Sequence, residues 1–461
     1  MAVVVDIVGG GLAGSECALT LARRGIAVRL YEMRPQVLSP AHRTSDFAEL
    51  VCSNSLKSLR ADSAAGLLKR ELVLMGSALI ELALKASVPA GGALAVDREQ
   101  FSQLVNAAIE AEPLIEVVCK EVTNLPKGYA VIAAGPLCSQ SLFEALSEKL
   151  GASRMSFYDA AAPIVDAESL DKEIIFSQSR YEEAGSGDYL NCPLNKKEYE
   201  QLVGELISAK RVIARDFEQK DLFSACQPIE EVARSGIDSL RFGALKPVGL
   251  TDPRTGHRPW AAVQLRAENV NKTAYNLVGF QTNLNWGEQK RIFRLIPGLE
   301  HAEFFRYGVM HRNSFVDSPH VLERGFCVPG TQIRLAGQIT GTEGYTEAIA
   351  SGLFAALNTY AALKGLAAPE LPPTAAFGSL VHYASDPFCV DYQPMHVNFG
   401  IVPPLDGPRL KKRERYAAYA KRAKTDMEVF VQNRQDLFGK YAGTWPDTNW
   451  ENASVEGHED A

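Results

Sequence analysis

The fold is decided by the stretch Val3-Val-Val-Asp-Ile-Val-Gly-Gly-Gly-Leu-Ala-Gly14 near the start of the chain. Its apolar run, broken only by Asp6, predicts a buried parallel strand that leads into a Gly9-x-Gly11-x-x-Gly14 turn at the start of a helix. Gly9 permits the tight turn, Gly11 lets backbone N–H groups approach a pyrophosphate, and Gly14 lets the helix pack closely on the strand. The N-terminus of the helix then faces the anion.

A second strand, Ile26-Ala-Val-Arg-Leu-Tyr-Glu32, follows the helix and ends in a carboxylate eighteen residues beyond Gly14. A carboxylate at this distance can accept hydrogen bonds from a ribose hydroxyl, so the whole unit predicts a dinucleotide site and not merely a glycine-rich turn. The unit alone does not separate FAD from NAD. The residues expected to bind the cofactor here are Gly9, Gly10, Gly11, Leu12, Ala13, Gly14, Glu32 and Arg34.

Length and composition indicate an ordinary globular protein. The 461 residues suffice for two or more domains, and 46% apolar and 22% charged residues are typical values. No segment has the length and apolarity of a membrane span, and the N-terminus lacks the pattern of a signal peptide, so we expect a cytoplasmic protein without a membrane partner. The net charge of -7 argues mildly against nucleic acid, although a local basic face would override it.

The eight cysteines show neither CxxC pairs nor nearby histidine spacing. The sequence therefore predicts no metal site and no disulfide framework, and any functional cysteine would be a free thiol. Cys52 is followed by Ser53, Asn54 and Ser55, which are good N-cap residues, so its thiol is expected near a helix N-terminus, where a thiolate is stabilised. A lone cysteine is nevertheless more often a small core residue, and Cys226 is open to the same interpretation.

The opening pattern returns late in the chain. Tyr129 to Gly135 predicts a strand of the first sheet that ends in Ala-Ala-Gly-Pro, which favours FAD, although a plain buried strand looks similar. Ile333 to Glu347 again has a strand, a glycine loop and the start of a long helix, which could direct a second helix N-terminus at the cofactor. Its predicted cofactor residues are Gly337, Gln338, Thr340, Gly341 and Tyr345, the last as a cover over the flavin.

The sequence thus predicts an α/β protein with a discontinuous Rossmann-like FAD-binding domain of the GR2 flavoprotein type. This domain is expected to comprise residues 1–155 and 325–408, with an inserted α+β domain at 156–324. Residues 409–461 are predicted to form a basic helical segment with an acidic tail. The basic run indicates either a solvated helix face or a patch for RNA phosphates. A single amphipathic helix is expected from Ser63 to Lys85.

Several of these motifs, taken together, resemble one family, the bacterial folate- and FAD-dependent tRNA (uracil-5-)-methyltransferases, or TrmFO/Gid family. The resemblance extends from about Val3 to Pro404. The matching stretches are Gly9 to Gly14, Tyr31-Glu-Met-Arg-Pro35, Phe47-Ala-Glu-Leu-Val-Cys-Ser-Asn-Ser55, Val88-Pro-Ala-Gly-Gly-Ala-Leu-Ala-Val-Asp-Arg98, Leu245-Lys-Pro-Val-Gly249, Val278-Gly-Phe-Gln281, Tyr307-Gly-Val-Met-His-Arg-Asn313 and Gly337-Gln-Ile-Thr-Gly341.

The resemblance implies methylation of C5 of a T-loop uridine in tRNA. It also implies FAD as cofactor, 5,10-methylenetetrahydrofolate as carbon donor and NADPH or NADH as reductant. Carried over by motif, Cys52 and Cys226 are the two active-site thiols. We assign Cys226 to attack on uracil C6 and Cys52 to a role beside the flavin, and the two roles can be exchanged.

A flipped uridine also needs stacking and phosphate contacts, so cationic side chains are candidates for binding RNA. They are Lys246, Arg254, His311, Arg312, Lys411, Lys412 and Arg413, each of which could equally be structural. No stable protein partner is expected, so the chain should be a monomer or a weak oligomer. The alternatives are an FAD-dependent oxidoreductase acting on a small molecule, a flavoprotein that binds RNA without turnover, and methylation of a ribosomal RNA uridine.

Overall fold

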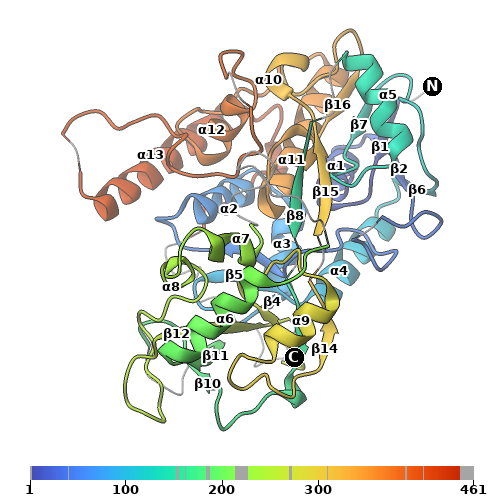
Figure 1. Cartoon of the computed structure of the whole chain (residues 1–461). Helices are drawn as coiled ribbons and strands as arrows, with labels where there is room; N and C mark the ends of the chain where they lie inside the picture. The colour runs from blue at the N-terminus through green and yellow to red at the C-terminus, as the bar shows by residue number, and fades with distance from the viewer. Residues whose placement is uncertain are drawn as a thin grey trace.

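The computed structural model describes residues 3–39, 41–151, 155–160, 162–182, 187–212, 227–268, 272–308, 310–389, 392–408 and 410–446, with backbone alone for 155–160 and 310–313. A parallel sheet organises the first part of the fold (Figure 1). Its strand order is β16-β7-β1-β2-β6. The strands are β1 (Val4–Val8), β2 (Ala27–Glu32), β6 (Ile115–Cys119), β7 (Ala130–Ile132) and β16 (Ile333–Leu335). The chain therefore returns to this sheet at Ile333, which confirms the predicted discontinuous Rossmann-like fold.

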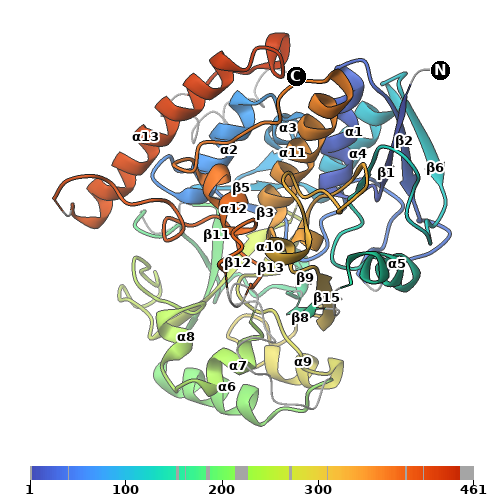
Figure 2. The same cartoon turned by 90° about the horizontal axis from the view of Figure 1, so that it is seen from above.

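The sheet is covered on both faces by helices. Val5, Ile7 and Val131 pack in the core on the α1 side, whereas Ile132 packs on the other side with Leu142 of α5. Helix α1 lies next to α11, α3 and α4 (Figure 2). The helices of this part are α1 (Leu12–Arg23), α2 (Ala64–Leu74), α3 (Ala78–Lys85), α4 (Arg98–Glu110), α5 (Gln140–Leu150), α10 (Ser318–Val321), α11 (Tyr345–Lys364), α12 (Ala376–Tyr383) and α13 (Lys412–Asn433).

A second, antiparallel sheet has a core of its own, which includes Val165, Val263 and Phe280. Its strand order is β10-β11-β12-β13-β9-β14. The strands are β9 (Ile164–Asp166), β10 (Phe176–Ser177), β11 (Tyr189–Leu194), β12 (Ala261–Ala267), β13 (Ala274–Leu277) and β14 (Phe304–Arg306). The helices of this part are α6 (Lys196–Ser208), α7 (Ile229–Arg234), α8 (Ser239–Phe242) and α9 (Trp286–Phe293).

Two smaller sheets complete the described structure. An antiparallel ribbon of β8 (Met155–Ala160) and β15 (Met310–Phe315) lies between the two large sheets (Figure 1). The chain passes through this ribbon on its way into the second part and again on its way out. The other small sheet has the order β3-β5-β4 and consists of β3 (Ser55–Ser58), β4 (Ser87–Val88) and β5 (Ala93–Val96).

The prediction of a single helix from Ser63 to Lys85 is wrong, because the structure has two helices there, α2 and α3. Gly76 adopts φ +80°, and a Cβ at this residue would lie 2.0 Å from the carbonyl oxygen of Tyr441. Ser77 then caps α3 by accepting a hydrogen bond from the N–H of Ile80. The apolar period continues through the break, so periodicity alone did not reveal it.

The described part of the basic run lies mostly on the exposed face of α13, which fits both predicted alternatives. Tyr419, Ala423 and Met427 are buried on the opposite face, where α13 packs against α2. In the part of the chain that the structure describes, no helix has both the length and the apolar composition needed to cross a membrane.

The contact between α1 and α11 gives a test of the packing. Gly352→Ala should lower Tm, since its Cβ would lie 2.1 Å from the Ala13 carbonyl oxygen, and overpacking of this kind costs about 1–3 kcal/mol. Gly204→Ala is the control. Gly204 lies within α6, its Cβ would meet nothing within 4 Å, and alanine there should stabilise the helix by up to about 1 kcal/mol. Thermal unfolding followed by circular dichroism measures both, and a Gly352→Ala protein at least as stable as wild type would contradict the packing.

Candidate dinucleotide and thiol site

A cavity of about 320 Å³ opens at the carboxyl ends of the parallel strands. Ligands bind at this edge in open α/β sheets, and the volume is within the range of small-molecule sites. The Ala133 to Leu137 segment after β7 forms part of the wall, as expected for the chain beneath a dinucleotide. The lining also includes many predicted residues, namely Gly9, Gly10, Gly11, Leu12, Ala13, Glu32, Arg34, Cys52, Gly337, Gln338 and Tyr345.

The glycine turn has the geometry that its spacing predicts. Gly9 adopts φ +106°, and a Cβ there would lie 2.5 Å from the carbonyl oxygen of Ala133. Gly14 does not line the cavity, and its lack of a side chain lets α1 rest on the turn, because a Cβ would lie 1.8 Å from the Gly9 carbonyl oxygen. Gly11 has no protein atom within 4 Å of a Cβ built on it. The turn therefore leaves open space where a pyrophosphate would approach.

Of the α-helices that begin at the cavity, α1 and α11 lack a side-chain cap, whereas α5 is capped by Ser139. Gly11 precedes α1 and Gly344 precedes α11, and neither N-cap makes a side-chain hydrogen bond. By contrast, Ser63, Ser77 and Asp97 cap α2, α3 and α4 through their side chains. Because the first N–H groups of a helix need partners, the two uncapped ends fit an anionic ligand such as a dinucleotide.

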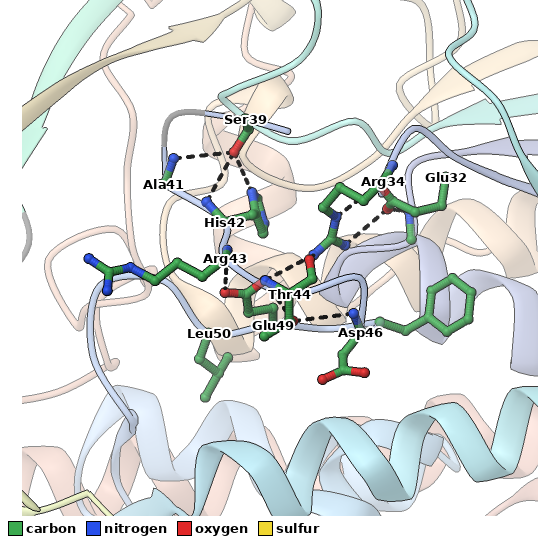
Figure 3. Close-up of polar contacts among 12 residues, drawn as sticks. Glu32, Arg34, Ser39, Ala41, His42, Arg43, Thr44, Asp46, Glu49 and Leu50 are labelled. Carbon is green, nitrogen blue, oxygen red and sulfur yellow. Dashed lines mark hydrogen bonds and ion pairs between the residues drawn. The ribbon is translucent and has the colours of Figure 1, made fainter. Parts of the chain in front are cut away.

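Glu32 is fixed by a network that includes Arg34 and Glu49 (Figure 3). Its Oε2 accepts a hydrogen bond of 2.9 Å from the Gly10 N–H, and its Oε1 accepts one of 2.9 Å from Arg34 Nε. Burial by itself favours the neutral acid, but the hydrogen bonds and charge of Arg34 outweigh it and lower the pKa of Glu32. Glu32 is therefore ionised at neutral pH, and it supports the glycine turn as well as lining the cavity.

Arg34 extends this network to the loop that follows β2. Its Nη1 donates to Glu49 Oε2 at 3.0 Å, and Glu49 in turn accepts from the N–H groups of Arg43 and Thr44. The side chain of Arg34 is only 2% exposed. Figure 3 shows how Arg34 connects the end of β2 with the 43–49 loop.

The second glycine loop is built by residues that do not themselves reach the cavity. Thr340 donates its hydroxyl to the Gly337 carbonyl oxygen at 2.8 Å. Gly341 adopts φ +81° beneath Tyr392, where a Cβ would lie 2.4 Å from the tyrosine hydroxyl. Thr340 and Gly341 thus support the Gly337 to Gln338 wall from behind, as Gly14 supports the first turn.

Cys52 lies in the wall of the same cavity. Its N–H and that of Ser53 donate hydrogen bonds of 2.7 and 3.2 Å to the hydroxyl oxygen of Tyr345, at the start of α11. The helix N-terminus that Ser53, Asn54 and Ser55 predicted beside Cys52 is wrong, because these residues lead into strand β3. The link from Cys52 to α11 is through the Tyr345 side chain. Burial raises the pKa of the Tyr345 phenol well above its usual value, so this hydroxyl stays protonated.

The second part of the fold also contributes to the cavity, through Gln281 in the loop between β13 and α9. The Gln281 carbonyl oxygen accepts a hydrogen bond of 2.7 Å from the N–H of Ile229 at the start of α7. Cys226, three residues before Ile229 in the sequence, lies outside the described residues. Gln281 belongs to the Val278 to Gln281 motif, but the sequence offered no pattern that would assign it a role.

The residues predicted to bind RNA are distributed over several elements. Lys246 is exposed after α8, and Lys411, Lys412 and Arg413 are exposed at the start of α13. Arg254 forms an ion pair of 2.9 Å with Asp252, which offsets its charge. The backbone of His311 and Arg312 lies in β15, and their side chains are outside the described part of the chain. None of the described ones lines the cavity. Nor do the described residues contain a cluster of metal ligands.

Solved structures show that the fold recurs elsewhere. GidA of Aquifex aeolicus, in its form II crystal, superposes with a TM-score of 0.66 at 13% identity, covering 95% of this chain and 74% of that one. The form I crystal gives a TM-score of 0.67 at 15% identity, covering 95% and 78%. The fold and the cavity together define a Rossmann-type dinucleotide-binding protein of the flavoprotein class.

A family model described as glucose inhibited division protein A matches residues 4–367. A methylenetetrahydrofolate--tRNA-(uracil-5-)-methyltransferase TrmFO from Moorella thermoacetica is 53% identical over 422 residues, which are 91% of this chain and 96% of that protein. The protein of the same name from Geobacter sulfurreducens is 52% identical over 429 residues, or 93% and 98%. The chain belongs to the TrmFO/Gid family, which confirms the resemblance found in the sequence.

The open space at Gly11 can be tested with a single methyl group. Gly11→Ala should leave the stability of the cofactor-free protein near that of wild type, because no protein atom lies in its way. A methyl group against the pyrophosphate should nonetheless weaken FAD binding on the order of tenfold, the equivalent of about 1.4 kcal/mol. Gly14→Ala is the comparison and should lower stability as well. FAD titration followed by flavin absorbance, with a thermal melt of the apoprotein, measures both effects. Full FAD affinity in Gly11→Ala would show that the dinucleotide does not cross the turn.

Proposed function

We propose that this chain methylates C5 of a T-loop uridine in tRNA and thereby forms 5-methyluridine. The proposed carbon donor is 5,10-methylenetetrahydrofolate, with FAD as cofactor and NADPH or NADH as reductant. Relatives that are 52–53% identical over more than nine tenths of this chain bear the name of this activity. The structural observation that supports it most is that Cys52 and the dinucleotide turn line one cavity.

The chemistry explains why a thiol and a flavin should share a site. Uracil C5 is a weak nucleophile, so a thiolate must first add to C6 and push electron density onto C5. C5 then attacks the one-carbon group, whose bond to its donor nitrogen breaks. The C5 proton passes to a base, and cleavage of the C6–S bond restores the double bond of the ring. FAD, once reduced by NADPH or NADH, would supply the two electrons that convert a methylene group into a methyl group. Two protein groups are thus needed, one that adds to C6 and one beside the flavin.

We assign the attack on C6 to Cys226. Cys52 is assigned the position beside the flavin, as acceptor of the C5 proton or as a transient partner of the methylene. Its place in the cavity wall supports this assignment. For Cys226 the support is indirect. Ile229 is hydrogen-bonded to the cavity residue Gln281, and three residues of chain span at most about 11 Å.

The residues that would hold FAD are those of the two glycine loops. The N-termini of α1 and α11 would face the phosphates, and the ionised Glu32 is placed to accept hydrogen bonds from a ribose hydroxyl. Tyr345, whose hydroxyl oxygen accepts the Cys52 and Ser53 N–H groups, orients the thiol segment relative to the cofactor loop. Its predicted role as a cover over the flavin stays a proposal.

Product formation tests the proposal. Purified protein incubated with unmodified tRNA, NADPH and methylenetetrahydrofolate should form 5-methyluridine, measured by nucleoside mass spectrometry, and should form none without folate. Cys226→Ala should reduce the rate by at least about a thousandfold, because the nucleophilic path is lost. Methylation that uses S-adenosylmethionine, or no methylation at all, would reject the function.

The two thiols are distinguished by a covalent trap. A mini-helix containing 5-fluorouridine should form a stable adduct with the wild-type protein and with Cys52→Ala, but not with Cys226→Ala. Fluorine cannot leave C5 as a proton does, so the C6–S bond persists. An adduct in Cys226→Ala that is absent from Cys52→Ala would mean that the two roles are exchanged.

We further propose that the start of α13 contacts tRNA phosphates, because Lys411, Lys412 and Arg413 are exposed and consecutive. Lys246 is a second candidate contact in the other part of the fold. Each phosphate contact releases bound counterions, so such residues determine the salt dependence of affinity. The net charge of -7 does not oppose this, since the local excess of cations decides the potential that an RNA backbone meets.

We consider a variant in which Lys411, Lys412 and Arg413 are all replaced by glutamine. In a plot of log affinity for tRNA against log salt concentration, its slope should be less steep by about two to three. Fluorescence anisotropy with labelled tRNA at several salt concentrations measures the slope. The control is a triple glutamine variant at Lys127, Lys149 and Lys364, which are equally exposed. An unchanged slope in the first variant, or an equal change in both, would remove α13 from the RNA-binding surface.

The proposal also includes the compartment and the assembly. We place the enzyme in the cytoplasm, with its tRNA substrate, as a monomer or weak oligomer. The seven cysteines within the described residues are free thiols, which suits a reducing compartment.

A further inference from the structure

The segment that carries Cys52 is held by side chains from distant parts of the chain. Three arginines, each from a different element, donate to residues 50–54. Arg98 of α4 donates to the Leu50 carbonyl oxygen at 2.7 Å, and Arg266 of β12 donates to Ser53 Oγ at 2.8 Å and Asn54 Oδ1 at 3.0 Å. The third is Arg306, at the end of β14.

Arg306 has the most direct contact with the cysteine. Its Nη1 donates to the Val51 carbonyl oxygen at 2.9 Å, and its Nη2 lies 3.5 Å from the Cys52 carbonyl oxygen and 3.2 Å from that of Ala162. The guanidinium fork thus contacts the carbonyl groups of the two peptide bonds that flank Cys52. Its buried Nε has no hydrogen-bond partner within the described structure. If Arg306 served only to hydrogen-bond the surrounding carbonyl groups, its Nε donor would be expected to have a partner as well.

Among the described side chains that bind residues 50–54 or pair with their arginine partners, cations outnumber anions. Glu268 pairs with Arg98, with 2.6 Å between Nε and Oε2, and its side chain is 6% exposed. Arg266 and Arg306 contact neutral groups of the segment. Among the described side chains that reach residues 50–54 or these arginines, three are cationic, Glu268 is anionic, and the Tyr345 phenol is neutral. The described side chains that bind this segment directly are thus mainly cationic, and nearby cations favour a thiolate over a thiol.

We infer that Arg306 is a positioning residue that activates Cys52, because it fixes the backbone on both sides of the cysteine and places a buried cation against that residue. The strand that carries Arg306 belongs to the second sheet, whereas the glycine turn belongs to the first. Reactivity of the thiol therefore depends on the docking of the two parts of the fold. The inference rests on the proposed function only in assigning Cys52 to the reaction.

The state of Arg306 agrees with this role. Burial lowers its pKa to about 10, with a further contribution from Arg98, while Glu268 and Cys52 act in the opposite direction. Arg306 is still a cation at neutral pH, and a buried cation gains from a nearby anion. Cys52 as a thiolate would supply that anion.

Alkylation of Cys52 tests the inference without reference to methylation. The full-length, FAD-loaded protein is treated with iodoacetamide at about pH 7 and about pH 9.5, and the labelled peptides are quantified by mass spectrometry. Arg306→Gln should slow the labelling of Cys52 at the lower pH by about fivefold or more. The rates should converge at the higher pH, where the thiol is ionised in either protein. Cys119, which is exposed on β6, serves as the internal reference.

Two further variants separate charge from backbone support. Arg306→Lys keeps a cation but loses the planar fork, so labelling at about pH 7 should stay near wild type while kcat for methylation falls. Arg291→Gln removes an exposed arginine of α9 that pairs with Glu205 and Glu288, and should change neither rate. A purely structural Arg306 would make glutamine and lysine variants equally slow at both pH values.

Glu268→Gln gives an independent test in case Arg306→Gln fails to fold or to hold FAD. Removing the anion that pairs with Arg98 should speed the labelling of Cys52 at about pH 7, the opposite direction from Arg306→Gln. Unchanged labelling in a folded Arg306→Gln protein, or in Glu268→Gln when the first variant does not fold, would overturn the inference. If Cys52→Ala still methylated tRNA while these labelling results held, the assignment of Cys52 would fail and the inference about Arg306 would stand.

Discussion

The structure depends on the close approach of backbone to backbone around α1. A side chain at Gly14 of α1 would collide with the Gly9 carbonyl group. A side chain at Gly352 of α11 would collide with the backbone of Ala13 in α1. These contacts bring α1 against its own turn and α11 against α1. Both helices therefore begin at one edge of the sheet, with their free N–H groups directed to one cavity. A larger residue at either position would separate the two N-termini that a dinucleotide needs together.

Most of the fold was predictable because its signals are local. A glycine turn between an apolar strand and a helix lies within a few residues, and the repeat of that pattern at Ile333 indicated a discontinuous domain. The division between α2 and α3 was not predictable, since Gly76 meets the backbone of Tyr441, a contact formed only in the folded chain. Likewise, Glu71 in the middle of α2 accepts the first N–H groups of α12, more than three hundred residues later. Burial raises its pKa to about 7.

The candidate site was predictable in part, for the same reason. The spacing of the first glycines predicted which backbone would line the cavity, and the structure has them there. From the sequence alone, Cys52 could be interpreted either as a small core residue or as a thiol near a helix N-terminus. Its hydrogen bond to Tyr345 crosses 293 residues, and such a partner leaves no trace in local spacing. Only the family resemblance connected Cys52 with Cys226. Glu32 was predicted only to bind a ribose hydroxyl, but its carboxylate also accepts hydrogen bonds from Gly10 and Arg34.

The division of the site between two cores follows from what the reaction must bring together. The cofactor needs a rigid cradle, and the first sheet with its two helices supplies one. A nucleotide base must enter from outside the cofactor site, so the groups that meet it are best placed where a second unit closes over the first. The Cys52 segment occupies that junction, since Tyr345 holds it from the cofactor side and Arg266 and Arg306 from the other. On the proposed role of Cys52, this arrangement ties the reactivity of the thiol to a complete site, because both units must be docked to supply all of these contacts.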